Sequence, residues 1–257
     1  MGKALDEFNA RLAGIKSDIS FVAAAARFRP YCYGSLDANV DPDIRTLAQN
    51  FANIKDSTTE GIYGALAIRL AASLERYQRS MLQESLSEIA AKAGIFSKIP
   101  KKLASRNVTL TGRLLAYSES PRDHLKVDVS ELIKNLASCA GDTRAFALNL
   151  QAFSATVSGV SDESIEQCLA ILEITDFWDS IFNDSKLQQL LEARRTPDAK
   201  KSGIQKMKDL SRWRNNWAHG GDDEASLTED ELVRMSIFIG RLVEVVDAMV
   251  KTRLRRR

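Results

Sequence analysis

The segment from residue 60 to residue 93 has the longest helical periodicity in the chain and constrains the fold more than any other feature. Its apolar residues recur at intervals of three and four: Ile62, Leu66, Leu70, Leu74, Tyr77, Met81, Leu82, Leu86 and Ile89. Gly94 follows this run as a suitable C-cap residue. We expect one long helix here, serving as the spine of the protein or as a subunit interface.

Most of the remaining chain also has helical patterns. The sequence predicts helices over residues 3–28, 41–51, 130–140, 143–155, 163–174, 177–182, 186–194 and 197–218. Thr228 and Glu231 form a capping box that begins a last amphipathic helix, which a basic tail follows. Residues 98–128 have a weaker pattern and no predicted helix. Because no segment alternates as a strand would, the predicted fold is all-α.

The size of the chain fits one helical domain. Its 257 residues can bury a sizeable core without disulfides or a metal. Residues 95–190 match no motif, and we interpret them as a helical insertion or subdomain on the bundle. The net charge is only +2, from 36 basic and 34 acidic residues, so a surface that binds nucleic acid must come from local clustering.

Several classes of protein are disfavoured by what the sequence lacks. Cys32, Cys139 and Cys168 form no CxxC pair, and with only two histidines they argue against a zinc site and for a reduced compartment. We interpret all three as structural. The sequence has no GxxxxGK, GxGxxG, GxSxG or HExxH motif, so no metal and no cofactor is predicted. The N-terminus does not resemble a signal peptide, and we expect a cytoplasmic protein without a membrane anchor.

Only two histidines are available for imidazole chemistry. His124 follows Pro121 in a predicted loop, where we interpret it as a solvated residue. His219 lies in the last turn of a predicted helix that Gly220 and Gly221 end. Asn215 shares the helix face of His219, four residues away. Arg214 is five residues from His219, and its long side chain together with the helix end lets the two groups converge.

An arginine, an amide and an imidazole suffice to cleave RNA without a metal, because the ribose 2′-hydroxyl supplies the nucleophile. In this hypothesis His219 transfers the proton, Arg214 binds phosphate oxygens, and Asn215 orients the imidazole or the phosphate. The products are a 2′,3′-cyclic phosphate and a free 5′-hydroxyl. DNA lacks the 2′-hydroxyl and is not cut by this route.

Residues 214–220, Arg-Asn-Asn-Trp-Ala-His-Gly, resemble the R-N-x-x-x-H motif of the HEPN superfamily, most closely its RiboL-PSP-type branch. Residues 70–77 are similar to an earlier helix of that branch, with Glu75 at its acidic position. The resemblance implies a helical bundle that dimerises into one composite cleft, and a metal-independent endoribonuclease acting as a toxic effector in antiphage defence or a toxin–antitoxin system. A tyrosine that follows the histidine in nucleotidyltransferase-paired HEPN toxins is absent here.

Alternatives stay open at each of these positions. Glu75 is either a surface residue or a residue that holds Arg214 or His219 in place. Trp213 and Trp217 are interpreted as packing residues. A candidate RNA-binding set of basic residues either attracts phosphates or is ordinary solvated surface. It comprises Lys98, Lys101, Lys102, Arg106 and Arg212.

Two other functions compete with the nuclease. One is a non-catalytic HEPN-like module that binds a partner protein or a nucleotide, and the other is a nucleic-acid-binding regulator that uses the basic clusters. For the nuclease, the expected partners are an RNA substrate, a second copy of the chain, and an antitoxin or a defence-system sensor or ATPase.

Overall fold

The structure is a computed structural model that describes residues 2–32, 41–116, 128–141, 146–220 and 227–256. These ranges are helical and contain no strand, which confirms the all-α prediction. None of the described helices combines the length and the hydropathy of a transmembrane span. His124 and Gly221, and the first residues of the helix predicted over 143–155, lie outside the described residues.

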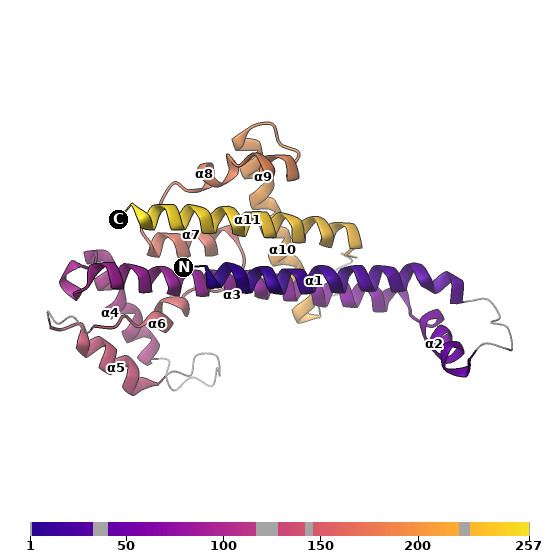
Figure 1. Cartoon of the computed structure of the whole chain (residues 1–257), viewed down its shortest axis with the longest axis horizontal. Coiled ribbons are helices and arrows are strands. Elements are labelled where there is room, and N and C mark those ends of the chain that lie inside the picture. The colour runs from indigo at the N-terminus through magenta and orange to yellow at the C-terminus, as the bar shows by residue number, and fades with distance from the viewer. Residues whose placement is uncertain (1, 33–40, 117–127, 142–145, 221–226, 257) are drawn as a thin grey trace.

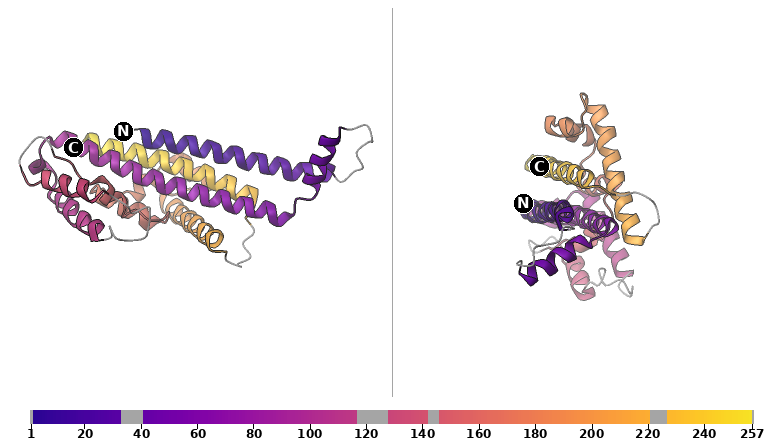
Figure 2. Two further views of the ribbon diagram at one scale, coloured as in Figure 1. Left: turned by 90° about the horizontal axis from the view of Figure 1, so that it is seen from below. Right: turned by 90° about the vertical axis from the view of Figure 1, so that its right-hand side faces the viewer.

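Three long helices run side by side and form the body of the molecule (Figures 1 and 2). They are α1 (Lys3–Phe28), α3 (Asp56–Ala93) and α11 (Glu229–Arg255). The predicted apolar stripe of α3 is largely buried, and α1 adds its own buried stripe of Phe8, Leu12, Ile15 and Ile19. α3 is therefore the spine of the bundle, as its periodicity predicts, and Gly94 ends it with φ = 70°.

α10 (Thr196–His219) crosses this layer and packs against α3 (Figure 2). Its start follows the sequence signal, since Pro197 lies in the first turn, where the missing N–H costs no hydrogen bond. α11 begins at the predicted capping box: the Thr228 side chain accepts a hydrogen bond from the Glu231 N–H, and the Glu231 carboxylate accepts one from the Thr228 N–H. α10, which contains the R-N-x-x-x-H segment, and α11, which follows it, thus both begin as predicted.

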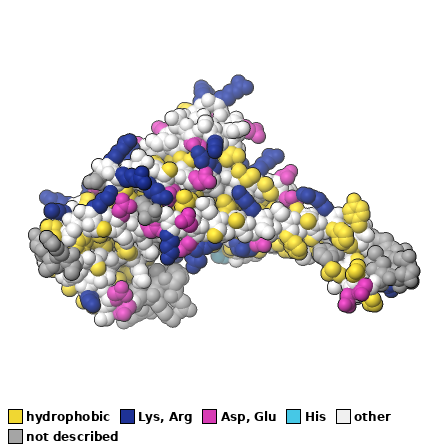
Figure 3. All heavy atoms as spheres, in the orientation of Figure 1, with side chains coloured by type: hydrophobic (Ala, Val, Ile, Leu, Met, Phe, Trp, Pro, Cys, Tyr) yellow, Lys and Arg dark blue, Asp and Glu magenta, His cyan; other side chains and the backbone are white. Residues whose placement is uncertain are grey.

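At one end of the body, η1 (Arg29–Cys32) and α2 (Pro42–Ala52) project away from the long helices (Figure 1). Several of the large apolar side chains at this end are exposed: Phe28, Tyr31, Ile44 and Leu47. Figure 3 shows hydrophobic side chains gathered on the same end of the molecule. This projecting end therefore presents an apolar surface to solvent.

The middle of the chain consists of short helices. They are η2 (Phe96–Lys98), α4 (Lys101–Ala116), α5 (Val129–Ser138), α6 (Leu150–Ser154), α7 (Asp162–Ile171), α8 (Trp178–Phe182) and α9 (Ser185–Leu190). Side chains from α6 to α9 belong to the same hydrophobic core as α1, α3, α10 and α11. Leu114, Leu132 and Ala152 form a small separate cluster between α4, α5 and α6. The interpretation of residues 95–190 as an insertion remains a prediction.

The prediction from the sequence contains no helix at α4, and the helix that it places over residues 143–155 is longer than α6. Buried polar residues explain the first error: α4 turns Asn107 and Thr111 inward, where an apolar stripe would be expected. Asn107 Oδ1 accepts a hydrogen bond from the Asn149 N–H at 3.0 Å, and Asn149 Nδ2 donates to Thr111 Oγ1 at 3.0 Å. The Asn149 N–H thus bonds to a side chain of α4, and α6 begins after it, at Leu150.

At Gly64 on α3, α10 approaches the spine closely. A Cβ atom built on Gly64 would lie 2.1 Å from Cδ2 of Trp217, a distance that real Cβ contacts do not reach. Gly64 is buried, and its missing side chain makes the room that the indole ring fills. The packing of α10 on α3 therefore requires glycine at this position.

We predict that Gly64→Ala destabilises the protein, although alanine is the better helix former. Overpacking against Trp217 should lower the free energy of unfolding by about 1–3 kcal/mol in urea denaturation. Gly61 on the same helix is the matched control, because a Cβ there meets no atom within 4 Å. Gly61→Ala should raise the stability by up to about 1 kcal/mol. Equal stabilisation by both substitutions would show that the Trp217 contact does not constrain the helices.

Candidate functional site

The R-N-x-x-x-H segment occupies the last two turns of α10. Gly220 ends this helix in the left-handed conformation, with φ = 63°, and its N–H donates to the Asn216 carbonyl. His219 is consequently the last helical residue, as the sequence predicts. The stop in the left-handed region explains the glycine, because other residues adopt this conformation only at a cost.

The two tryptophans fix the orientation of this end of the helix. Trp213 is 9% exposed and belongs to the hydrophobic core, while the half-buried Trp217 packs against that core. This confirms their interpretation as packing residues. With the indole rings turned inward, Asn215 and His219 lie on the exposed face, and Arg214 lies half-buried between the two faces.

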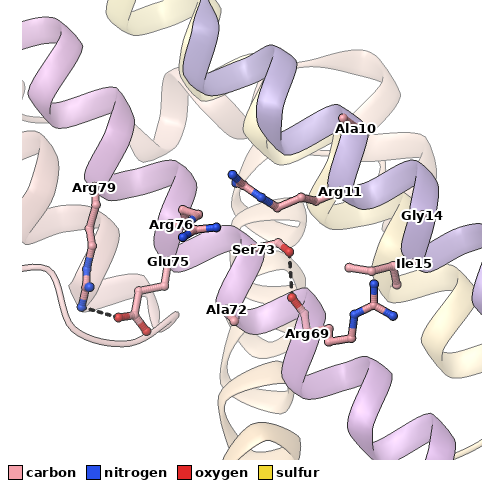
Figure 4. A pocket seen from close by; sticks show the side chains of 10 residues that line it. All are labelled: Ala10, Arg11, Gly14, Ile15, Arg69, Ala72, Ser73, Glu75, Arg76 and Arg79. Atoms are coloured by element: carbon pink, nitrogen blue, oxygen red, sulfur yellow. Dashed lines mark hydrogen bonds and ion pairs between the residues drawn. The ribbon is translucent and has the colours of Figure 1, made fainter. Parts of the chain in front are cut away.

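Glu75 is the residue of α3 that contacts Arg214. Its Oε2 atom lies 3.9 Å from Nη2 of Arg214, and its side chain is 17% exposed. Its other oxygen, Oε1, accepts a hydrogen bond from Nη2 of Arg79 at 2.5 Å (Figure 4). Two residues that are 139 positions apart in the sequence, Glu75 and Arg214, are thus brought together, as expected for a residue that holds Arg214 in place.

His219 and Asn215 are placed differently from Arg214. Within the described part of the chain, neither side chain has a hydrogen bond or ion pair, and none joins Arg214 to His219. Five residues of an ideal helix separate two side chains by about 140° in azimuth. One protomer therefore presents a guanidinium and an imidazole on the same helix end without bringing them into contact.

The three lysines of the candidate RNA-binding set do not lie near Arg214. Lys98, Lys101 and Lys102 are exposed beyond the far end of α3. Eighteen helical residues separate Glu75 from Ala93, the end of α3, which is about 27 Å along the axis. These three lysines thus form a separate basic surface.

The other two members of that set make contacts within the fold. Arg106 Nη1 donates to the Ala170 carbonyl at 2.6 Å and ties α4 to α7. Arg212 on α10 is exposed and pairs with Asp209 at 3.2 Å. Arg106 thus has a structural role that the sequence did not predict, and Arg212 is part of a surface ion pair on α10.

The structure also places Glu75 at the rim of a groove that the sequence did not predict. The groove lies between α1 and α3 and has a volume of about 630 Å³ (Figure 4). Four arginines line it: Arg11, Arg69, Arg76 and Arg79. The sequence signal that could have found part of it is the seven-residue spacing of Arg69 and Arg76, which places both on one face of α3.

The cysteines are poor candidates for nucleophiles. Cys168 is fully buried, with Sγ 3.7 Å from the Gln78 carbonyl, and burial raises the pKa of its thiol to about 12. Burial also raises the pKa of Cys139. Since the thiolate is the reactive form, neither group is activated. Within the described ranges, no three His, Cys, Asp or Glu side chains are grouped so as to hold a metal ion.

Comparison with known proteins gives one result for this chain. A family model described as RiboL-PSP-HEPN matches residues 40–252, which include α3, the middle region, α10 and most of α11. The chain matches no curated protein and no solved structure. Both segments on which the resemblance was noted, residues 70–77 and 214–220, lie within the matched range.

Proposed function

This chain belongs to the RiboL-PSP-HEPN family, and from that membership we propose that it is a metal-independent endoribonuclease. HEPN domains are generally ribonucleases, so membership in this family supports nuclease activity. The proposal that these residues cleave RNA without a metal depends on the arrangement at the end of α10. Arg214 lies beside Glu75, while Asn215 and His219 are exposed and have no partner among the described residues. Exposed polar side chains on a rigid helix are available for a substrate.

The proposed reaction uses the RNA itself as the nucleophile. The 2′-oxygen attacks the adjacent phosphorus, its proton passes to an imidazole, and the bond from phosphorus to the 5′-oxygen breaks as that oxygen receives a proton. His219 is the proton-transfer group, and Arg214 stabilises the charge that develops on the phosphate oxygens. Asn215 orients the imidazole or the phosphate. The chain ends formed are a 2′,3′-cyclic phosphate and a 5′-hydroxyl.

A second copy of the chain completes the site in this proposal. The azimuthal separation of Arg214 and His219 leaves them apart within one protomer, whereas two α10 ends facing each other supply two guanidiniums and two imidazoles. One imidazole then accepts the 2′-proton while the other donates to the 5′-oxygen. Glu75 acts as a positioning residue that holds Arg214 through their 3.9 Å contact.

We predict that the purified protein cleaves single-stranded RNA in the presence of EDTA and leaves the matching DNA uncut. Arg214→Ala and His219→Ala should each lower the cleavage rate by about 100-fold or more, since each removes charge stabilisation or proton transfer. The rates are measured on a labelled oligonucleotide, and the chemistry of the ends is identified by mass spectrometry.

Arg194→Ala serves as the control for this experiment, because Arg194 is exposed and has no partner among the described residues. All variants should retain the thermal transition of the parent, because the substituted side chains lie outside the hydrophobic core. If Arg214→Ala and His219→Ala cut RNA as fast as the parent, these residues do not form the site.

The composite site predicts a homodimer. Light scattering after size exclusion should give a mass of twice the 28.5 kDa of the chain. A mixed dimer of Arg214→Ala and wild-type subunits should retain part of the activity, whereas a homodimer of the variant should not. A protein that is monomeric at the concentrations where it cleaves RNA would refute the composite arrangement.

We further propose that the enzyme is a cytoplasmic toxic effector of an antiphage defence or toxin–antitoxin system, restrained by an antitoxin or by a sensor or ATPase partner. The support is the family match, since the resemblance to this HEPN branch implies such a role.

The second candidate function is a non-catalytic module that binds a partner protein. The exposed apolar end around Tyr31 and Leu47 favours it, because such surfaces mark protein contacts.

A growth assay separates these two functions. Induced expression of the parent should arrest growth of the host, and His219→Ala should abolish the arrest at equal protein level. Under the module hypothesis the parent causes no arrest, or His219→Ala arrests growth equally. Tyr31→Ser with Leu47→Ser is the converse variant, which should weaken partner binding and leave RNA cleavage unchanged.

A further inference from the structure

Small residues on both helices leave space in the groove between α1 and α3. Ala10 and Gly14 on α1 and Ala72 and Ser73 on α3 are among its lining residues (Figure 4). A Cβ atom built on Gly14 meets no other atom within 4 Å, so the space at that position is empty. A volume of about 630 Å³ falls in the range of sites that bind small ligands.

The charge of the groove is strongly positive. Its lining contains four arginines and one carboxylate, that of Glu75, which gives a formal charge of +3. Arg11 pairs with Glu7 at 3.0 Å, Arg69 pairs with Asp18, and Arg79 pairs with Glu75. Arg76 is exposed and has no partner among the described residues. Within the described ranges, one guanidinium in the groove is therefore unpaired.

The existing ion pairs do not prevent the groove from binding an anion. The side chains of Arg69 and Asp18 are 55% and 47% exposed, and pairs this exposed to water contribute little stability. A phosphate can take the place of such a carboxylate at small cost. The planar guanidinium donates two parallel hydrogen bonds to phosphate oxygens, so arginines are well suited to this ligand.

The groove adjoins Arg214 through Glu75. Glu75 lines its rim and also contacts Arg214 at 3.9 Å. Arg69 and Arg76 follow along α3, two helical turns or about 10 Å apart, and Arg11 projects from α1 opposite Arg76 (Figure 4). A row of cations thus leads from the end of α10 along α3.

We propose that this groove binds the phosphodiester backbone of single-stranded RNA next to the cleavage site, with Arg76 as the main phosphate ligand and Arg11 and Arg69 supporting it. The proposal rests on the proposed function, since it takes RNA as the ligand. It adds a binding site to that function: the strand is held by α1 and α3 and passes Glu75 to reach Arg214. Recognition is through the backbone and is therefore independent of base sequence.

The test measures binding separately from cleavage. A fluorescent 2′-O-methyl RNA oligonucleotide, which has no nucleophile, is titrated with the full-length protein and followed by anisotropy. Arg76→Glu should raise the Kd by about tenfold or more, because a charge-assisted contact becomes a repulsion. Arg76→Ala should lower the slope of log K against log salt by about 0.7, the value for one phosphate contact with a single strand.

Gly14→Leu tests the location, because it fills the groove and changes no charge. It should weaken binding as much as Arg76→Glu while the thermal transition is retained, since glycine within a helix is not required there. Arg194→Glu is the matched charge control, because it makes the same charge change outside the groove, between α9 and α10. It should change the Kd by less than about twofold.

The outcomes distinguish this proposal from the nuclease proposal. Loss of binding in Arg76→Glu and Gly14→Leu supports the groove even if the parent cuts no RNA, in which case only the nuclease assignment fails. If the parent cleaves RNA and both variants bind and cleave as it does, the groove proposal is overturned and the nuclease stands. Groove-dependent binding of ATP without binding of the oligonucleotide would also overturn it, and would assign the groove to a mononucleotide.

Discussion

The contact between Trp217 and Gly64 determines where α10 lies on the spine of the bundle. Because Gly64 has no side chain, the indole ring fills the space above α3, and Trp213 enters the core one turn earlier. These two contacts fix the azimuth of α10, so the polar residues of the same two turns must face outward or toward Glu75. The position of Arg214 beside Glu75 is therefore a consequence of tryptophan packing.

Sequence periodicity predicted the long elements well, because their apolar stripes are buried in the usual way. α1, α3, α10 and α11 all occur close to their predicted bounds, and the glycine stops after α3 and α10 are present. The prediction failed where polar side chains occupy the interior. Asn107 and Thr111 replace an apolar stripe on α4, and their hydrogen bonds to Asn149 involve residues about forty positions away, which a local pattern does not contain.

The candidate site was predictable only in part. The R-N-x-x-x-H segment and its glycine stop are local, and the resemblance of residues 70–77 indicated Glu75 as a residue that could hold Arg214. The groove was not predictable, because it combines arginines from two helices that are separated by about sixty residues in the sequence. The hydrogen bond from Arg106 to the Ala170 carbonyl on α7 also joins residues far apart in the sequence. The sequence therefore placed Arg106 only in a basic cluster.

One contact connects the middle region to the electrostatics of the end of α10. Arg79 Nε donates to the Val157 carbonyl at 3.1 Å, in the segment that joins α6 to α7, while the same guanidinium occupies one oxygen of Glu75. Arg79 and Arg214 thus share the single carboxylate of Glu75. The hydrogen bond to the Val157 carbonyl helps to fix the position of Arg79 beside it. The segment that joins α6 to α7 thus contributes to the charge that Glu75 presents to Arg214, through a hydrogen bond in which Arg214 takes no part.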